Sequence, residues 1–440
     1  MVDGGQRMFG YYIDLALRSL KRSPILTALM VLAIGLGIGA SMTMLTVLNV
    51  MTRDPLPGRS SQIYRPRLNP LPLDYHYKPS TVGGPTTALT WPDAKALLDA
   101  HRGVRQAAMA RGYLTARSDR SSTAPRSVAG SFTTHDFFAM FGVPFVAGHG
   151  WSGQDDVDAT PVVVVTRKLA ERLFGTASAV GRTAHLGKHD FQVVGVVEDW
   201  HPQPLFYAII GTSFDDGDQF YLPLSTAMSS HLSHNWDSGW GKDDSPISAT
   251  VSWLSFWVEL DSPTQVSAYR RFLVNYSARQ KELGRYERPA SEARLYGLMP
   301  WLHHEGLVPN DVMLQTWLAL GFLFVCLVNI VALLLAKFLR KGGEISVRRA
   351  LGARRRDVFR QLGIESALIG LAGGVLGIAL AELGLWTVRQ RPDDYAHLAR
   401  MNGVMLIATV VLAIVVSVLA GLLPAWRACR IAPALRLKTL

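Results

Sequence analysis

Four long apolar segments dominate the hydropathy pattern of the chain. The hydrocarbon core of a bilayer requires roughly 20 mostly apolar residues in a helix. The first and fourth segments contain no charged residue, the second is interrupted only by polar uncharged residues, and the third carries Glu365 and Glu382 near its ends. The pattern therefore predicts four membrane-spanning helices, over residues 24–52, 312–336, 362–388 and 403–425.

The polar stretch between the first two apolar segments, residues 53–311, has the size of a globular domain. Its β-branched runs and capping residues predict both strands and helices. The predicted strands are 161–165, 189–199 and 254–260. One predicted helix begins after Thr90, a second ends at Gly175, and a third covers 263–283. The expected fold class is a membrane protein with a four-helix α transmembrane domain and a large α+β extracytoplasmic domain inserted between helices 1 and 2.

Basic residues are concentrated beside the apolar segments. The chain has 45 Lys and Arg against 34 Asp and Glu, and 49% of its residues are hydrophobic. This distribution favours a membrane protein over a nucleic-acid-binding protein, whose basic residues would cover a soluble domain. The basic flanks are expected on the cytoplasmic side. This places an amphipathic N-terminal segment (1–23), a loop (337–361) and a tail (426–440) in the cytoplasm, with 53–311 and a short loop (389–402) outside.

The sequence contains none of the motifs that would make the chain an enzyme by itself. A P-loop G-x-x-x-x-G-K-[ST] is absent, because the two Gly-Lys pairs are followed by His189 and Asp243. His303, His304 and Glu305 stand together without H-E-x-x-H spacing, and no G-x-S-x-G elbow occurs. We therefore expect no catalytic residue, no metal site and no cofactor in this chain.

Aromatic residues are dense in the outer domain, above all between residues 200 and 257. Packing in a core or an interface is favoured over a small-molecule cage, and the role of residues 229–257 stays open. The two cysteines lie elsewhere, Cys326 in the second apolar segment and Cys429 in the tail. No disulfide is therefore expected within the outer domain.

Small and polar residues inside the apolar segments indicate how the helices pack. Three G-x-x-x-G pairs would let another helix approach closely. The predicted helix-packing residues are Gly35, Gly39, Gly370, Gly373, Gly374 and Gly377. Glu382 has two interpretations: a side chain that reaches the headgroup region or faces the helix bundle, which we favour, or part of a proton path.

An arginine-rich segment, residues 344–366, separates the second and third apolar segments and holds six arginines against three acidic residues. Glu344 and Arg348 can pair four residues apart, and Gly352 can end a short helix. A second helix can begin near Arg354 and continue into the third span. One interpretation is a topology signal alone, and the other, which we favour, is a docking element for a cytoplasmic partner at the surface of the lipid membrane.

The same region resembles a known family. The segment NIVALLLAKFLRKGGEISVRRALGARRRDVFRQLGIESALIGLAGGVLGI (329–378) is similar to the signature of FtsX/MacB-type ABC transporter permeases, in which an E-I-x-x-R-x-A-x-G-A loop leads into a glycine-rich span. LPAWRACRIAPALRLK (423–438) resembles the closing motif of the family. In the outer domain, residues 135–151, 161–199 and 221–227 are similar to the MacB-type periplasmic core domain. The resemblance covers most of the chain, in the order of the family.

The resemblance implies a permease subunit in the bacterial inner membrane, with both termini cytoplasmic. In this family two permeases, the same or homologous chains, form a dimer, and a cytoplasmic ATPase that binds ATP and Mg²⁺ docks on each loop. Closure of the ATPases is transmitted along the helices to the periplasmic domains, which implies export with an adaptor and an outer-membrane channel. The implied ATPase-coupling residues are Glu344, Ile345, Val347, Arg348, Arg349, Ala350, Leu351 and Gly352.

The chain departs from the family pattern in two respects. MacB carries its ATPase on the same chain, whereas only residues 1–23 precede the first span here, so a separate ATPase is expected. Residues 229–253 have no clear counterpart. The alternative functions are a lipoprotein-releasing permease and an FtsX-like transmembrane regulator of a cell-envelope hydrolase, with a membrane-anchored outer enzyme as a more distant one. The sequence does not identify the transported substrate, and it does not distinguish a homodimer from a heterodimer.

Overall fold

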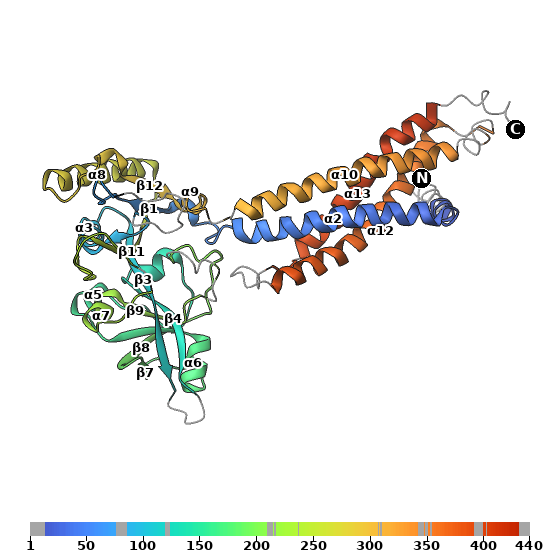
Figure 1. The fold of residues 1–440 in the computed structure, drawn as a ribbon. Helices are drawn as coiled ribbons and strands as arrows, with labels where there is room; N and C mark the ends of the chain where they lie inside the picture. The colour runs from blue at the N-terminus through green and yellow to red at the C-terminus, as the bar shows by residue number, and fades with distance from the viewer. Residues whose placement is uncertain are drawn as a thin grey trace. The chain divides into compact units, whose positions relative to one another are not determined.

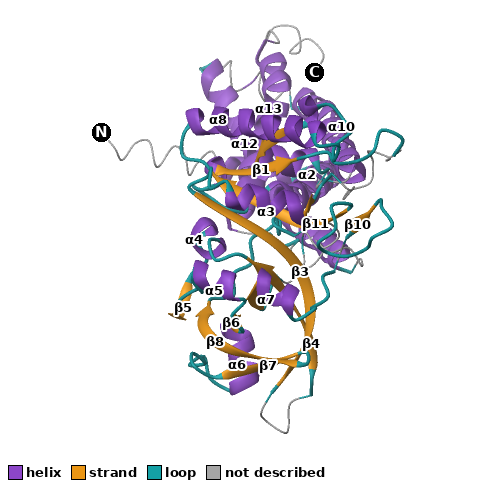
Figure 2. Cartoon of the chain, turned by 90° about the vertical axis from the view of Figure 1, so that its left-hand side faces the viewer, coloured by secondary structure: helices purple, strands orange, loops and turns teal. Residues whose placement is uncertain are grey.

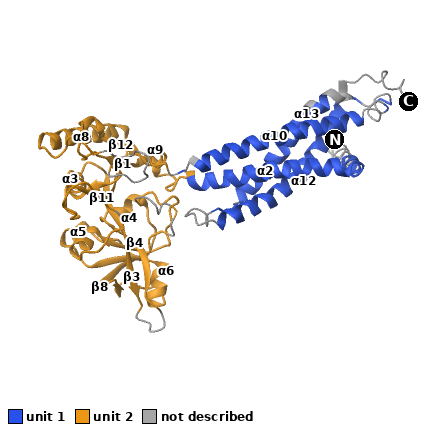
Figure 3. Ribbon diagram, viewed as in Figure 1, with its two compact units in different colours: residues 1–51, 308–440 blue, residues 52–307 orange. Residues whose placement is uncertain are grey.

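A computed structural model describes most of the chain and divides it into two compact units (Figure 3). The first unit comprises residues 1–51 and 308–440, and the second comprises residues 52–307. The described residues are 14–75, 86–118, 124–208, 214, 217–235, 237–306, 308, 310–341, 347, 351–352, 354–390, 399–401 and 403–430. In the described part of the chain, the first unit is helical and the second contains all the strands.

Four long helices lie side by side in the first unit (Figure 1). They are α2 (Pro24–Thr52), α10 (Asn310–Arg340), α12 (Arg355–Arg389) and α13 (Gly403–Arg430). Each is long and apolar enough to cross a membrane, which confirms the predicted four-helix class. The last three extend beyond the apolar segments into basic sequence, because helical backbone hydrogen bonding does not stop where hydrophobicity does. A short N-terminal helix, residues 14–21, precedes α2.

The six predicted glycines lie at contacts between these helices. A Cβ at Gly35 or Gly39 would come within 2.8 Å of the side chain of Leu376 or Leu380 on α12. The remaining four divide between two partners. Gly373 and Gly377 face Ile34 and Ile38 of α2, whereas Gly370 and Gly374 face Ser417 and Ala413 of α13. The three-residue offset therefore places two glycine surfaces on α12, one for each neighbouring helix.

Gly373→Leu is expected to destabilise the helical unit, because a Cβ at this position would lie 2.4 Å from Cγ2 of Ile34. Overpacking of this kind costs about 1–3 kcal/mol. Thermal unfolding in detergent, followed by helical circular dichroism, measures the effect. The matched control is Gly363→Leu on the same helix, where a Cβ meets no atom within 4 Å. Equal losses in both variants would contradict the assigned role of Gly373.

The second unit is built on one 12-stranded sheet of the described residues. Its main path runs β12-β1-β11-β3-β4-β9-β6-β8-β5, with β2 and β10 beside β11, and β7 beside β3 and β8. The strands are β1 (Ile63–Arg67), β2 (Leu89–Thr90), β3 (Arg105–Arg117), β4 (Arg126–Thr133), β5 (Phe145–Gly148), β6 (Val162–Thr166), β7 (Thr183–Leu186), β8 (His189–Val197), β9 (Phe220–Pro223), β10 (Ser238–Gly239), β11 (Val251–Glu259) and β12 (Arg294–Gly297).

The long strand β3 joins two halves of this sheet (Figure 2). Its first part pairs with β11 and the remainder pairs with β4, with Met109 shared between both. Helices α3 (Trp91–Asp99), α8 (Pro263–Glu282) and α9 (Leu298–His304) contact the β11–β1–β12 half. Helices α4 (Phe137–Phe141), α5 (Gly153–Asp158), α6 (Arg167–Phe174) and α7 (Leu224–Ser229) accompany the other half. Short 3₁₀ turns occur at η1 (Ser60–Gln62) and η2 (Ala290–Glu292).

Local signals in the sequence locate several of these elements. Thr90 accepts a hydrogen bond from the backbone N–H of Asp93 and caps α3, and Gly175 ends α6 in the left-handed conformation that favours glycine. Strands β6 and β8 and helix α8 lie where they are predicted. Strand β11 begins at Val251, three residues before the predicted start, because Val251 and Ser252 pair with β10.

Both faces of the central strands are buried. Side chains alternate along β11, so that Phe256 and Val258 enter one core cluster while Trp257 enters the other. The same alternation divides the four valines of β6 between the two clusters. A strand covered on both faces has no side turned to water, which explains why β6 reads as a continuous apolar run. The aromatic residues 206, 207, 220, 221, 253, 256 and 257 are buried, so the expected core packing is confirmed for them.

Candidate functional site

The connection between α10 and α12 contains the predicted coupling residues. Val347, Leu351 and Gly352 are described by the structure, whereas the other five lie outside the described residues: Glu344, Ile345, Arg348, Arg349 and Ala350. The N–H of Leu351 donates to the carbonyl of Val347 at 3.0 Å, which closes one helical turn. Gly352 follows with φ +102°, a value that favours glycine and ends the turn.

This turn presents apolar side chains to the surroundings. Leu351 is 83% exposed and Val347 is 47% exposed, although they sit in a strongly basic segment. An exposed leucine by itself is common on protein surfaces. Leu351 stands on a single turn between two helices that can each cross a membrane.

Helix α12 carries the connection directly into the membrane-spanning region. Arg354 is the extended N-cap residue, and Asp357 lies in the first turn, where its carboxylate complements the positive end of the helix dipole. The helix then continues without interruption to Arg389. Its 35 residues, at 1.5 Å each, give a rod about 52 Å long.

The ends of α10 and α12 beside this connection are joined by buried charges that the sequence does not predict. Glu365 on α12 is completely buried and lies 2.6 Å from the ammonium of Lys337 on α10. Lys341, just after α10, contacts the same carboxylate at 3.0 Å. The sequence shows Glu365 only as one charge near the end of an apolar segment, and no spacing rule connects it to its partners.

Glu382 lies towards the other end of α12, where its surroundings favour one of its two interpretations. Its side chain is 52% exposed and pairs with Arg389 at 2.8 Å. Arg389 also donates to the carbonyl of Ala399 at 2.8 Å. An exposed carboxylate paired with an arginine of its own helix fits a position near the headgroups.

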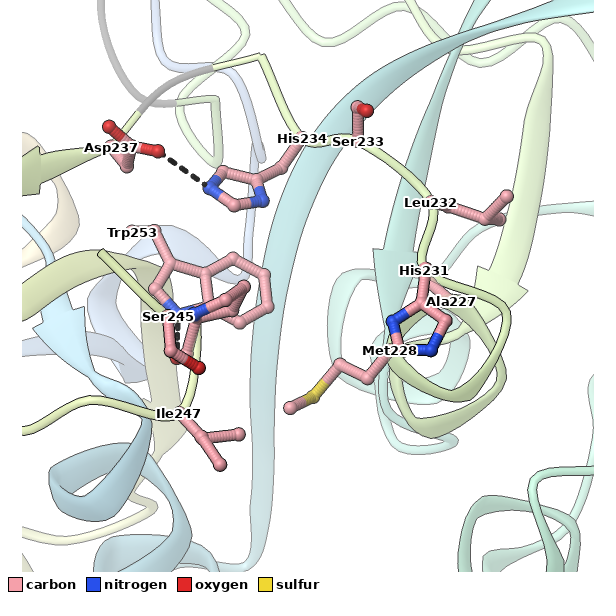
Figure 4. A pocket seen from close by; sticks show the side chains of 11 residues that line it. Ala227, Met228, His231, Leu232, Ser233, His234, Asp237, Ser245, Ile247 and Trp253 are labelled. Carbon is pink, nitrogen blue, oxygen red and sulfur yellow. Dashed lines mark hydrogen bonds and ion pairs between the residues drawn. The ribbon is translucent and has the colours of Figure 1, made fainter. Parts of the chain in front are cut away.

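The outer unit contains a cavity of about 500 Å³ beside β11 and α7 (Figure 4). His234 stacks on Trp253 with ring centroids 4.5 Å apart and pairs with Asp237 at 3.3 Å. Burial lowers the pKa of His234, and the nearby Asp237 opposes this shift. Met228 and Ile247 add apolar side chains to the wall. Most of its lining residues come from 229–253, and Trp236, in the same aromatic group, lies outside the described residues.

His304, the last residue of α9, and Glu305, directly after it, have separate contacts. His304 stacks on Tyr296 with ring centroids 4.8 Å apart. Glu305 acts electrostatically on Arg65, whose guanidinium lies over the rings of Trp257 and Trp301. Burial lowers the pKa of Arg65 to about 10, and Glu305 opposes this shift. No group of three potential ligands is arranged to hold a metal ion among the residues that the structure describes.

A buried ion pair connects β3 to the segment before β9. The guanidinium of Arg111 donates to Asp218 at 2.7 Å, and the two side chains are 3% and 0% exposed. Ser131 on β4 donates to the other carboxylate oxygen at 2.6 Å. Burial raises the pKa of the adjacent Tyr221 well above its usual value, and the carboxylate of Asp218 adds to this shift. These groups are enclosed by the sheet, and we assign them a structural role.

Comparison with known proteins agrees with both units of the fold. Residues 27–275 match the family model of the MacB-like periplasmic core domain, and residues 317–433 match the model of the FtsX-like permease C-terminal region. The periplasmic region of MacB from Actinobacillus actinomycetemcomitans superposes with a TM-score of 0.36 and 13% identity, over 56% of this chain and 93% of that one. The family assignment rests on the two family models.

Two relatives are exporters by name. The macrolide export ATP-binding/permease protein MacB of Acinetobacter baylyi is 24% identical over 302 residues, which are 68% of this chain and 41% of that protein. The pyoverdine export ATP-binding/permease protein PvdT of Pseudomonas syringae pv. tomato is 25% identical over 310 residues, which are 70% of this chain and 42% of that protein. The chain thus spans about two fifths of the length of these relatives. Because the first family model alone covers more than half of it, the chain belongs to the ABC transporter permeases that combine a MacB-like periplasmic core domain with an FtsX-like C-terminal region.

Proposed function

We propose that the chain is the permease subunit of an exporter in the bacterial inner membrane, driven by an ATPase that docks on the connection between α10 and α12. The observation that carries this proposal is the exposed turn of Val347 and Leu351, ended by Gly352 and followed at once by the continuous helix α12. The 440 residues contain no P-loop, so ATP and Mg²⁺ are bound by a domain outside this sequence.

The mechanism proposed for this permease is mechanical. Closure of the ATPase moves the turn, and α12 carries the displacement across the membrane as a rigid rod. The glycine contacts of α12 with α2 pass the movement to the helix that leads directly into the outer unit. The outer unit then changes its contacts with cargo, with an adaptor and with an outer-membrane channel. No step requires acid–base chemistry in this chain.

A second permease subunit completes the proposed assembly. Helix α10 carries large apolar side chains that face out of the helical unit, including Trp317, Leu318 and Phe324, each more than 60% exposed. Such a surface is suited to contact with lipid and with a neighbouring membrane helix. A dimer would place two coupling turns side by side, one for each of two ATPase domains.

The proposed orientation places the coupling turn and both termini in the cytoplasm. The N-terminal helix contacts the connection-facing ends of α10 and α12 through Ser19, Lys341 and Glu365, so these basic segments lie at one end of the helical unit. The direct test of the docking proposal is capture of an ABC ATPase by the membrane-embedded chain and the dependence of this capture on Leu351.

Cysteine labelling tests the orientation. In a chain with both native cysteines replaced by serine, a membrane-impermeant maleimide is expected to label Ser178→Cys in cells with a permeabilised outer membrane. Arg356→Cys is expected to react only after the inner membrane is opened. Both positions are exposed in the structure, so accessibility depends on the side of the membrane. The opposite labelling pattern would overturn the orientation and, with it, the docking of a cytoplasmic ATPase on this connection.

A further inference from the structure

One buried ionic cluster joins three segments of the helical unit that are remote in sequence. It consists of Ser19 on the N-terminal helix, Lys337 and Lys341 at the end of α10, and Glu365 on α12, and we call it the Glu365 clasp. Ser19 Oγ donates to Glu365 at 2.6 Å although 346 residues separate them. Lys337 Nζ lies 2.6 Å from the same oxygen, and Lys341 Nζ lies 3.0 Å from the other. Lys341 also donates to Ser19.

The charged groups of the clasp are largely shielded from solvent. Glu365 is completely buried, and the side chains of Lys337 and Lys341 are 2% and 19% exposed. Buried ion pairs contribute little net stability, because desolvation offsets most of the attraction. An ion cluster adds geometric specificity to apolar packing, because its short contacts form in only one arrangement of the three segments.

The clasp borders both ends of the coupling connection. Lys337 lies in the last turn of α10, and Lys341 is the first residue after the helix, where the connection begins. Glu365 lies ten residues after the first residue of α12, which is about three helical turns. On the next residue, the carbonyl of Ser366 accepts a hydrogen bond from Ser417 of α13. The start of α12 is therefore tied to three other helices within two consecutive residues.

The N-terminal helix is held against this site by more than one contact. Ala16 is completely buried, and Leu20 packs against the core of the helical unit. Ser19 lies between them on the inward face and supplies the polar contact with Glu365. The N-terminal helix thus contacts the clasp through one polar side chain and the core of the helical unit through apolar ones.

We infer that Glu365 is a positioning residue that joins the N-terminal helix, the end of α10 and the start of α12 into one body at the base of the coupling turn. The role in coupling rests on the proposed function, whereas the attachment itself does not. With the clasp intact, a displacement of the turn moves α10 and α12 together. Without it, the end of α10 bends and the N-terminal helix separates, so that the displacement is absorbed before it reaches the membrane-spanning region.

Thiol accessibility tests the attachment without any ATPase. The full chain carries Ala16→Cys as a reporter and Cys429→Ser, and it keeps the native Cys326, which is buried in α10. Two clasp variants are compared with this parent: Glu365→Gln, and the apolar triple variant of Lys337→Met, Lys341→Met and Glu365→Met. N-ethylmaleimide modification is followed at each cysteine by peptide mass spectrometry.

The expected result is modification of residue 16 at least about tenfold faster in both variants, because a segment that has lost its tie opens locally at lower free energy. Cys326 is expected to react at its unchanged slow rate, which shows that the four-helix packing persists. If Glu365→Gln exposes Cys326 as well, that variant has unfolded. The triple variant leaves no unpaired buried charge, and its labelling at residue 16 then tests the attachment. Unchanged labelling of residue 16 in a variant with protected Cys326 would overturn the inference.

Coupling is tested in the assembled complex with its ATPase. The reporter is Leu383→Cys on the far part of α12, where Leu383 is 58% exposed. Its labelling rate is compared with and without Mg-ATP and vanadate. In the triple variant we expect ATPase capture and ATP hydrolysis to persist while this nucleotide-dependent change disappears. A retained change would show that the clasp does not couple. If the parent chain captures no ATPase, the proposed function fails, and the labelling of residue 16 still decides the attachment.

Discussion

Leu351→Asp is expected to abolish capture of the ATPase while leaving the amount of chain in the membrane unchanged. Leu351 is 83% exposed, so the substitution removes no internal contact. The segment keeps its excess of arginine, so insertion is unaffected. At a protein–protein contact, burying a leucine contributes about 1.5–3 kcal/mol, and an unpaired carboxylate in its place adds a desolvation penalty. A loss of about 2 kcal/mol alone weakens binding about thirtyfold.

Affinity purification of the tagged chain from membranes, with the ATPase quantified in the eluate, measures this effect. Leu283→Asp is the matched control, because Leu283 is also an exposed leucine, at 66%, but follows α8 in the outer unit. The control is expected to capture ATPase at the level of the unchanged chain. A loss in both variants would indicate a general defect in assembly.

The double variant Arg348→Lys, Arg349→Lys separates docking from topology. Lysine keeps the positive charge that directs insertion, whereas it lacks the planar guanidinium and its fixed donors. We expect normal insertion and reduced ATPase capture. Both arginines lie outside the described residues, so this expectation comes from the sequence alone. Normal capture by this variant and by Leu351→Asp would leave the arginines as a topology signal and move the docking surface to the N-terminal helix or the tail.

Asp218→Ala is expected to destabilise the outer unit by about 3–5 kcal/mol, the usual cost of removing one partner of a buried ion pair. The substitution leaves the guanidinium of Arg111 at 3% exposure without its carboxylate, and it removes the acceptor of Ser131. Adding Arg111→Met to Asp218→Ala is expected to recover much of the loss, because no buried charge then remains unpaired.

Urea unfolding of the full chain in detergent, followed by tryptophan fluorescence, gives the free energy of unfolding for these variants. Asp99→Ala is the matched control, because Asp99 forms an exposed pair with Lys95 four residues earlier on α3. Exposed pairs contribute about 0–1 kcal/mol, so the control is expected to lose little. If Asp218→Ala were no more destabilising than Asp99→Ala, the buried pair would not support the sheet as described.

Elements defined by neighbouring residues were predictable from the sequence. The four membrane helices follow from uninterrupted apolar length, which is a local property. Thr90 and Gly175 mark a helix start and a helix end through hydrogen bonding and backbone conformation within a few residues. Val347, Leu351 and Gly352 form the expected turn for the same reason.

The tertiary structure decided everything that depends on partners distant in the chain. The glycine spacing predicts close helix contacts, but only the assembled helices show that Gly373 meets α2 while Gly370 meets α13. The contact of Glu365 with Ser19 spans 346 residues, and that of Asp218 with Arg111 spans 107. Such pairs leave no periodic pattern in the sequence. A charged residue can be buried wherever the fold places an opposite charge beside it, and the order of residues does not show where that is. The sequence therefore determined the helices, the strands and the family signature, and only folding decided which charges are buried together and which helices they join.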